Sequence, residues 1–147
     1  MMNVVSLTAI EGTDPELIHA LVEADLPTED LLDADRHFFR ATEPGGQTVG
    51  FAGVERCQGS RLLRSVVVLP AYRGSGLGRA LVESTLNTLG KDGDVFLATT
   101  SAASFFKRAG FVEVSRDMVP APVLATRQLS SICPSSATIM RLDRPPI

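Results

Sequence analysis

Residues 61–81, which read RLLRSVVVLPAYRGSGLGRAL, decide the fold of this chain. They contain an unbroken apolar run from 66 to 69, typical of a strand buried on both faces, and Pro70 ends that strand because it lacks a backbone donor. A segment with helical periodicity follows from 77 to 89. Between the two lie three glycines, Gly74, Gly76 and Gly78. The sequence therefore predicts a central strand, a glycine loop and a helix, in that order.

A glycine loop at a helix N-terminus favours a bound phosphate, because unpaired N–H groups and the positive end of the helix dipole meet there. The P-loop motif is excluded, since no Lys-Ser or Lys-Thr pair follows these glycines. The dinucleotide fingerprint GxGxxG does not fit, since Gly78 comes one position early. Asp94 stands at the distance of a ribose-binding carboxylate, but it precedes the next apolar run instead of ending it. The loop thus predicts phosphate binding of another kind.

The composition predicts one domain over residues 1–147, since 44% of 147 residues are hydrophobic and can form a real core. A net charge of −3 provides no basic field, so nucleic acid is not expected as a partner. Cys57 and Cys133 lack metal-ligand spacing, and we expect no metal and two free thiols in a reducing cytoplasm. No stretch reaches membrane-spanning length, so we expect a cytoplasmic protein without a membrane partner. The oligomeric state is left open, with a homodimer as one option.

The remaining periodic segments predict a sheet that begins antiparallel and then crosses over. Pro44 and two glycines form a turn between strands at 36–42 and 48–56, which predicts a hairpin. The strand at 94–99 follows a helix and is therefore expected to run parallel to the central strand. Further strands are expected at 4–8, 111–114 and 136–142, and further helices at 15–24, from 28 to 32, and at 102–109. The fold class is α/β in the broad sense, or α+β.

Arg73-Gly74-Ser75-Gly76-Leu77-Gly78 resembles the R/Q-x-x-G-x-G/A signature of GNAT N-acetyltransferases, which bind the pyrophosphate of acetyl-CoA. The order of predicted elements resembles the whole GNAT fold. That resemblance implies a mixed, mostly antiparallel sheet in which a central parallel strand pair is splayed apart and flanked by helices. Residues 97–101 and 103–111 are similar to a stretch of GNAT enzymes that acetylate amino acids, such as N-acetylglutamate synthases. Softer matches at 23–27, 49–55, 63–65 and 120–140 resemble the arsenic-resistance branch most.

The resemblance implies acetyl-CoA as the cosubstrate. The backbone N–H of Val66 would face the acetyl carbonyl, although a plain core valine is the alternative reading of that position. The implied cofactor-binding residues are Val66, Val67, Val68, Arg73, Gly74, Ser75, Gly76, Leu77, Gly78, Arg79, Thr100, Phe105 and Phe106.

The usual side-chain catalysts of the family are missing, because Leu62 and Phe106 occupy the positions of its common Glu and Tyr. Either the amine loses its proton to water, or another carboxylate substitutes. Glu55, which alternation places on one face with Phe51 and Gly53, is the candidate base. A solvated strand-end carboxylate is the alternative.

Acceptor binding is predicted for Arg64. Alternation places it on one face with Leu62 and Val66, and an arginine on an apolar strand requires an anionic partner. That partner is a substrate carboxylate held bidentately, or else Glu55, Asp25 or another internal acid in a structural salt bridge. The predicted acceptor set is completed by Ser65, Arg127, Ser130 and Ser131.

The sequence thus predicts an N-acetyltransferase that moves an acetyl group from acetyl-CoA to the amine of a small amino-acid-like acceptor. Similarity to the arsenic-resistance branch implies a glutamate-analogue toxin, such as arsinothricin or phosphinothricin, as an acceptor. Two alternatives remain open: a non-catalytic acyl-CoA-binding or sensor module, and a protein or peptide N-acetyltransferase.

Overall fold

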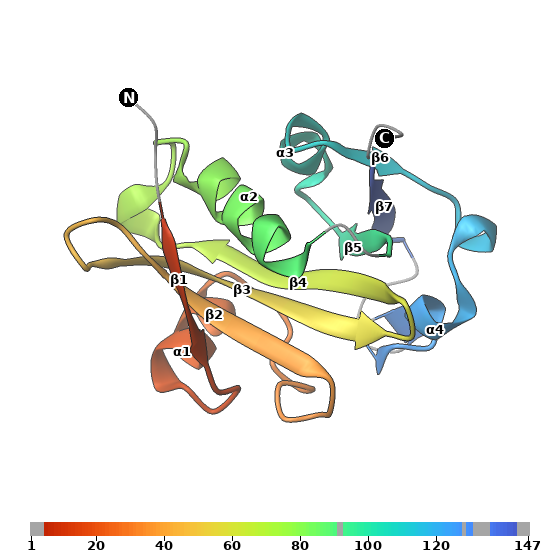
Figure 1. Ribbon diagram of the computed structural model, residues 1–147, viewed down its shortest axis with the longest axis horizontal. Coiled ribbons are helices and arrows are strands. Elements are labelled where there is room, and N and C mark those ends of the chain that lie inside the picture. The colour runs from red at the N-terminus through yellow and green to blue at the C-terminus, as the bar shows by residue number, and fades with distance from the viewer. Residues whose placement is uncertain (1–4, 91–92, 128, 131–135, 144–147) are drawn as a thin grey trace.

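The structure is a computed structural model that describes residues 5–90, 93–127, 129–130 and 136–143. Within these residues one sheet has the strand order β1-β2-β3-β4-β5-β7-β6 (Figure 1). The strands are β1 Ser6–Ile10, β2 Arg36–Thr42, β3 Thr48–Cys57, β4 Ser60–Val68, β5 Val95–Thr99, β6 Phe111–Glu113 and β7 Thr138–Leu142. The helices are α1 Pro15–Glu23, α2 Leu77–Leu89, α3 Ala103–Arg108 and α4 Ala121–Leu124, with 3₁₀ turns at Pro70–Tyr72 and Arg116–Met118.

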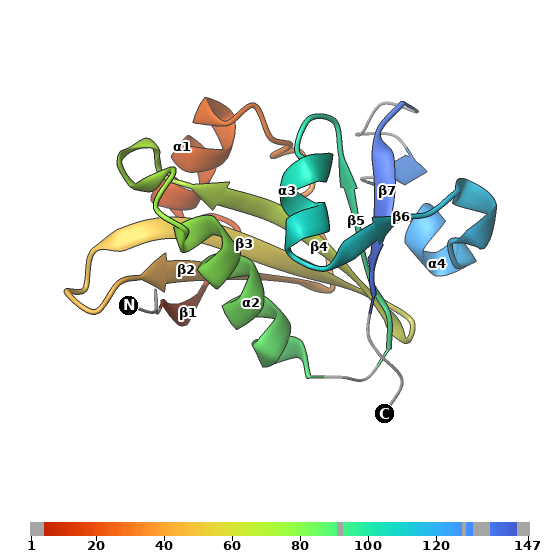
Figure 2. The same ribbon diagram turned by 90° about the horizontal axis from the view of Figure 1, so that it is seen from above.

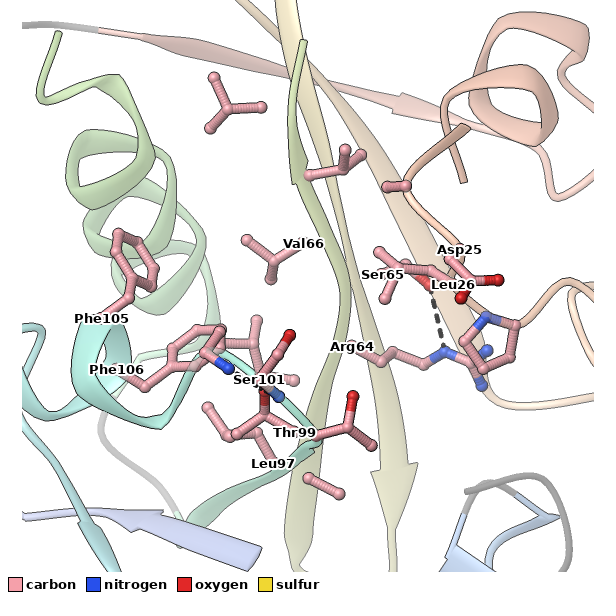
Figure 3. A pocket seen from close by; sticks show the side chains of 18 of the residues that line it. Asp25, Leu26, Arg64, Ser65, Val66, Leu97, Thr99, Ser101, Phe105 and Phe106 are labelled. Carbon is pink, nitrogen blue, oxygen red and sulfur yellow. Dashed lines mark hydrogen bonds between the residues drawn. The ribbon is translucent and has the colours of Figure 1, made fainter. Parts of the chain in front are cut away.

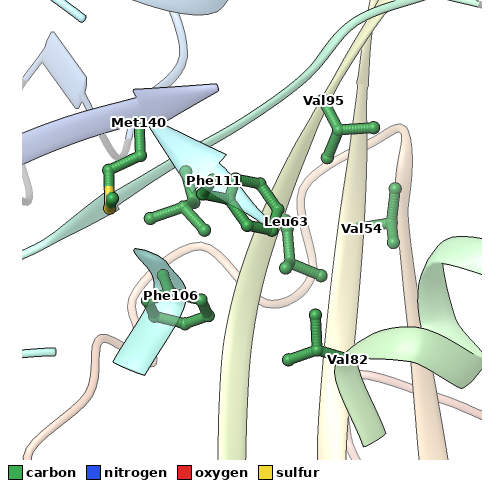
Figure 4. Close-up of a cluster of buried hydrophobic side chains, with 8 residues drawn as sticks. Val54, Leu63, Val82, Val95, Phe106, Phe111 and Met140 are labelled. Atoms are coloured by element: carbon green, nitrogen blue, oxygen red, sulfur yellow. The ribbon is translucent and has the colours of Figure 1, made fainter. Parts of the chain in front are cut away.

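Helices cover both faces of the sheet. Figures 1 and 2 show α2 and α3 on one face and α1 on the opposite one. On the α2 and α3 face, Leu63 of β4 packs with Val82 and Phe106 in the cluster that Figure 4 shows. On the opposite face, Phe51 and Val67 pack against Leu17 of α1. The central strands are therefore buried on both faces, as their continuous apolar runs predict.

Most of the predicted elements are confirmed. The hairpin forms β2 and β3, with Phe38 opposite Gly53, and the crossover through α2 makes β5 parallel to β4. Helix α1 begins after Asp14, whose side chain accepts hydrogen bonds from the backbone N–H groups of Glu16 and Leu17, as expected for an N-cap. The first strand lies at Ser6–Ile10, two residues later than predicted.

The short helix predicted from 28 to 32 is wrong, because this segment consists of turns and irregular backbone. Asp30 at its centre is fully buried and points at arginines of two strands, Arg36 and Arg64. Leu31 is buried in a neighbouring apolar cluster. These tertiary contacts outweigh the weak helical preference of so short a segment.

The central parallel pair is splayed. Among the described residues, β4 pairs with β5 only where Arg61 lies opposite Val95 and Leu62 opposite Phe96. Beyond these positions the two strands diverge, and β5 pairs instead with β7 on its other side. The gap that the sequence predicted is therefore present.

A β-bulge in β4 accompanies the divergence. Phe51 lies opposite Val67 and Gly53 opposite Arg64, so three steps along β4 match two along β3. Within this bulge Ser65 has a φ of 55°, in the left-handed region that few non-glycine residues adopt.

This bulge overturns the prediction that Arg64 and Val66 share a face. The Arg64 guanidinium lies over the Phe38 ring, 5.8 Å from its centroid, on the α1 side of the sheet. Val66 packs on the opposite side, against the cluster that contains Val82. One extra residue between them reverses the alternation.

We expect Phe111→Ala to lower the free energy of unfolding by about 3–5 kcal/mol, since Phe111 is 1% exposed and a cavity would replace its ring. The matched control is Val112→Ala at the next, 39% exposed position, where the loss should stay under about 1 kcal/mol. Urea denaturation of both variants measures the difference. Equal losses would contradict the assignment of Phe111 to the core.

Candidate active site

A cavity of about 900 Å³ opens where β4 and β5 diverge (Figure 3). One half is bounded by the loop after α1, and the other by α3 and the start of α2. Figure 3 shows Arg64 and Val66 on opposite sides of β4, so the strand contributes to both halves. The lining residues are 24–29, 63–68 and 97–102, together with Arg73, Gly78, Phe105 and Phe106.

The half next to α2 and α3 is apolar and bordered by a strand edge. Val66 and Val68 line it from β4, and Phe105 and Phe106 line it from α3 with their rings 5.0 Å apart in an edge-to-face arrangement. Because β4 pairs with β5 only at its other end, this part of its edge can accept an extended ligand as an additional strand.

The glycine loop joins this half at its end. Gly74 and Gly76 have φ values of 80° and 82°, which glycine adopts without strain. At Gly78 a Cβ atom would lie 3.2 Å from the Phe105 ring, so a side chain there would crowd the cavity wall. The Arg73 Nε donates to the Val68 carbonyl at 2.9 Å, which holds the arginine against the end of β4.

The first turn of α2 is suited to an anion. Its N-cap, Gly76, has no side chain that could cap the helix, so the N–H groups of this turn are capped by no side chain. These observations fit the diphosphate of a coenzyme A molecule whose extended arm lies along β4.

Beneath the other half lies a buried cluster of two arginines and two carboxylates. Arg64 donates to both Asp30 oxygens in a bidentate pair, Nη1 to Oδ2 at 2.5 Å and Nη2 to Oδ1 at 2.6 Å. Its Nη1 also donates to the Glu55 Oε1 at 3.4 Å. Arg36 contacts Asp30 at 3.2 Å and Glu55 at 3.4 Å. The four formal charges cancel.

The two carboxyl groups of this cluster have opposite pKa shifts. Burial raises the pKa of Glu55, and its two arginine neighbours only partly counteract this. Burial also acts to raise the pKa of Asp30, but its hydrogen bonds and charge contacts with Arg64 and Arg36 outweigh this and lower it. Asp30 is therefore the group whose charge the protein stabilises.

The structure places the predicted site residues unevenly around the cavity. Arg64 and Ser65 line it. Arg64 forms a salt bridge with an internal acid, which was one of the two alternatives from the sequence, and that acid is Asp30. Arg127 instead contacts Asp33 at 2.8 Å, and neither it nor Ser130 is among the lining residues. Ser131 lies outside the described residues.

Glu55 also lies outside the lining set, beneath Arg64. Of the predicted cofactor residues, those that line the cavity are Val66, Val67, Val68, Arg73, Gly78, Thr100, Phe105 and Phe106. Gly74, Ser75, Gly76, Leu77 and Arg79 form the adjoining loop and first turn of α2.

The two positions where the family commonly has its catalytic Glu and Tyr are occupied here by side chains that pack in the core. Leu62 is fully buried with Phe96 and Val123, and Phe106 packs edge-to-face on Phe111. Cys57 is a buried free thiol, and burial raises its pKa to about 11. Cys133 lies outside the described residues.

Sequence reasoning missed three contributors to the site. Asp30 and Arg36 have no local signal, because Asp30 stands 34 positions from the arginine that it holds. Thr99 was assigned to a strand end and to the family-like stretch at 97–101 but was given no role in the site. Its Oγ1 accepts from the backbone N–H of Ala102 at 2.9 Å and shapes the wall at the start of α3.

Residues 34–113, more than half of the chain, match the family model described as the acetyltransferase (GNAT) domain. The chain belongs to the GNAT acetyltransferase family. A relative, an uncharacterized N-acetyltransferase of Chlorobaculum tepidum, is 33% identical over 99 residues. This match covers 63% of the chain and 60% of that relative's length.

Solved structures share the GNAT fold across almost the whole chain. N-acetylglutamate synthase from Neisseria gonorrhoeae, complexed with coenzyme A and L-arginine, superposes with a TM-score of 0.72 at 20% identity. The superposition covers 97% of this chain and 34% of that one. An acyl-CoA N-acyltransferase from Pseudomonas aeruginosa gives a TM-score of 0.61 at 24% identity, covering 95% and 99%. At these identities the likeness shows the fold alone.

The described part of the chain shows neither a membrane-spanning helix nor a metal site. It contains no helix whose length and apolar character would let it span a membrane. Nor do its histidine, cysteine and acidic side chains gather into a group that could hold a metal ion.

We expect Asp30→Asn to lower the free energy of unfolding at pH 7 by about 3–5 kcal/mol, since it breaks a buried ion pair and leaves Arg64 without its main partner. The folded pKa of Asp30 lies below its ordinary value of 3.8, so its contribution is present above that value and lost as pH falls through the folded pKa. The difference between variant and parent should therefore shrink in acid.

Urea denaturation at several pH values measures this trend. The matched control is Asp33→Asn, whose side chain is 37% exposed and should cost less than about 1 kcal/mol. A difference that stays constant down to about pH 2 would contradict the assignment.

Proposed function

We propose that this protein transfers an acetyl group from acetyl-CoA to the amine of a small acceptor. The observation that carries the proposal is the cavity at the splayed end of β4 and β5, which the glycine loop joins at one end. Family membership and the GNAT fold support it. The chain spans only part of the curated relative it matches, so the activity is inferred from this site's own geometry.

Donor binding rests on main-chain groups and one arginine. The amides of the loop and of the first turn of α2 would hold the diphosphate, with Arg73 adding positive charge. The arm of the donor would lie along the edge of β4 near Val66 and Val68, against the Phe105 ring. The loop glycines keep the approach open.

Acetyl transfer needs a neutral amine, a thioester within reach and stabilisation of the charge that develops on the carbonyl oxygen. The backbone N–H of Val66, at the bulge in β4, is our candidate for that stabilisation. The amine nitrogen attacks the carbonyl carbon, the carbon–sulfur bond breaks, and the sulfur leaves as thiolate. The amine proton passes to a base.

Glu55 remains the candidate base. Burial raises the pKa of Glu55 above its ordinary value of 4.5, which makes its carboxylate a stronger base. Since Glu55 lies beneath the cavity wall, the proton would reach it through a water molecule near Ser65 and Arg64.

The acceptor is a small molecule, because the loop at 24–29 walls the cavity opposite α3. The sequence resemblance implies an amino-acid-like acceptor, including a glutamate analogue such as arsinothricin or phosphinothricin. Its carboxylate would have to compete with Asp30 for Arg64. Peptide acetylation and acyl-CoA binding without turnover remain the alternatives that the assay below separates.

The direct test is thiol release from acetyl-CoA with free amino acids, phosphinothricin, polyamines and peptides as acceptors. We expect amine-dependent release with at least one small acceptor. Binding of coenzyme A without turnover of any acceptor would indicate a binding module. Exclusive turnover of peptides would indicate a peptide acetyltransferase.

The donor site is tested separately by titrating coenzyme A calorimetrically. We expect Arg73→Ala to raise the Kd at least about tenfold, since a charge-assisted contact contributes about 1.5–3 kcal/mol. The matched control, Arg56→Ala, removes the same charge from an exposed position at the far end of β3 and should leave the Kd unchanged. Equal effects of the two variants would overturn the donor site.

For the base, we expect Glu55→Gln to lower kcat at least about 100-fold while the KM for acetyl-CoA stays the same. Steady-state kinetics from about pH 4 to 9 measures both constants, and the acidic limb of the parent's pH profile should vanish in the variant. An unchanged kcat with an unchanged pH profile would indicate that the acceptor amine loses its proton to solvent and not to Glu55. Circular dichroism confirms that the variant is folded.

A further inference from the structure

In the part of the chain that the structure describes, one cation lines the acceptor half of the cavity. Of the charged residues that line the cavity, Arg73 lies at the glycine loop, whereas Arg64, Asp25 and Glu29 surround the acceptor half. Figure 3 shows Asp25 and Arg64 on the same side of β4. A substrate carboxylate bound in this half would therefore depend on Arg64.

All three nitrogens of Arg64 already donate to groups of the protein itself. Its two terminal nitrogens meet the two oxygens of Asp30 at 2.5 and 2.6 Å, the fork-to-fork geometry that a substrate carboxylate would itself use. The remaining nitrogen, Nε, donates to the Ser65 hydroxyl at 3.4 Å, the hydrogen bond drawn in Figure 3. Asp30 thus occupies the place that a bound carboxylate would take.

Asp30 is also fixed in that place. It is fully buried, and its Oδ2 accepts from the Nη2 of Arg36 at 3.2 Å. A ligand that displaced Asp30 from Arg64 would leave a fully buried carboxylate without its main partner, which is strongly unfavourable. A substrate carboxylate does not offset this loss, because it gains only the same pair of hydrogen bonds to Arg64.

Among the described residues that line the acceptor half, none is a second cation. Within the described residues neither Asp25 nor Glu29 takes part in an ion pair, and both are exposed at the rim. The buried cluster is neutral, so these two carboxylates leave the acceptor half negative. Because solvent screens Asp25 and Glu29, they repel a substrate carboxylate only modestly. The preference for an acceptor without a carboxylate therefore depends on the pairing of Asp30 with Arg64.

We propose that the acceptor is an amine without a carboxylate beside its reacting nitrogen, and that Asp30 sets this specificity by filling the carboxylate-binding fork of Arg64. The inference rests on the proposed acetyl transfer and narrows its substrate class. It departs from the amino-acid acceptor that the sequence resemblance implies.

The test uses acceptor pairs that differ only by the carboxylate: phenethylamine with phenylalanine, and agmatine with arginine. Thiol release from acetyl-CoA gives kcat/KM for each compound. We expect the unaltered protein to favour the amine in each pair at least tenfold. Equal or better turnover of the amino acids would overturn the inference alone, whereas no turnover of any amine would overturn the proposed function with it.

Asp30→Ala should empty the fork and narrow or reverse the preference within each pair. The ratio within a pair is the readout, because a merely structural loss would lower both members alike. Asp33→Ala is the matched control: it removes a neighbouring acid that contacts Arg36 and Arg127, and it should keep the parent's ratio. An unchanged ratio in folded Asp30→Ala would overturn the role of Asp30.

A second measurement needs no turnover. Sodium acetate should raise the Tm of Asp30→Ala, relative to equal sodium chloride, because acetate can bind the emptied fork. The parent and Asp33→Ala should show no such difference, and its absence in Asp30→Ala would overturn the assignment. If Asp30→Ala does not fold even with acetate, the inference is still tested by the unaltered protein. Its ratio of kcat/KM for the amine to kcat/KM for the amino acid then confirms or overturns the preference.

Discussion

The separation of β4 from β5 is the constraint on which the rest of this structure depends. Two paired positions hold the strands together at one end, and a bulge at Ser65 turns β4 away at the other. A closed sheet would be more regular, but it would leave no edge for an extended ligand. Apolar clusters on both faces of the sheet pack β4 against helices and hold it in place where it separates from β5.

The bulge also determines which side chains of β4 face each half of the cavity. By reversing the alternation it directs Val66 toward α2 and Arg64 toward α1. The donor half is thus apolar and bounded by main chain, while the acceptor half lies above a buried network of charges. Such a network adds little net stability compared with an apolar core. Its value here is to fix the loop at Asp30 relative to β4.

Most of the fold could be predicted from the sequence, because its signals are local. The apolar run that ends at Pro70, the spaced glycines, and the turn before β3 each require a particular backbone, whatever surrounds them. The segment at 28–32 failed for the opposite reason. It is too short to favour a helix by itself, and contacts with distant arginines determined its shape.

The sequence by itself determined the order of most elements along the chain, the glycine loop at the N-terminus of α2 and the absence of the family's usual catalytic Glu and Tyr at Leu62 and Phe106. Only the tertiary structure decided which partner Arg64 has and which face it occupies. Alternation fails across a bulge, and the pairing with Asp30 joins residues 34 positions apart. Local patterns record backbone preferences, whereas the meeting of two buried charges depends on how the whole sheet folds.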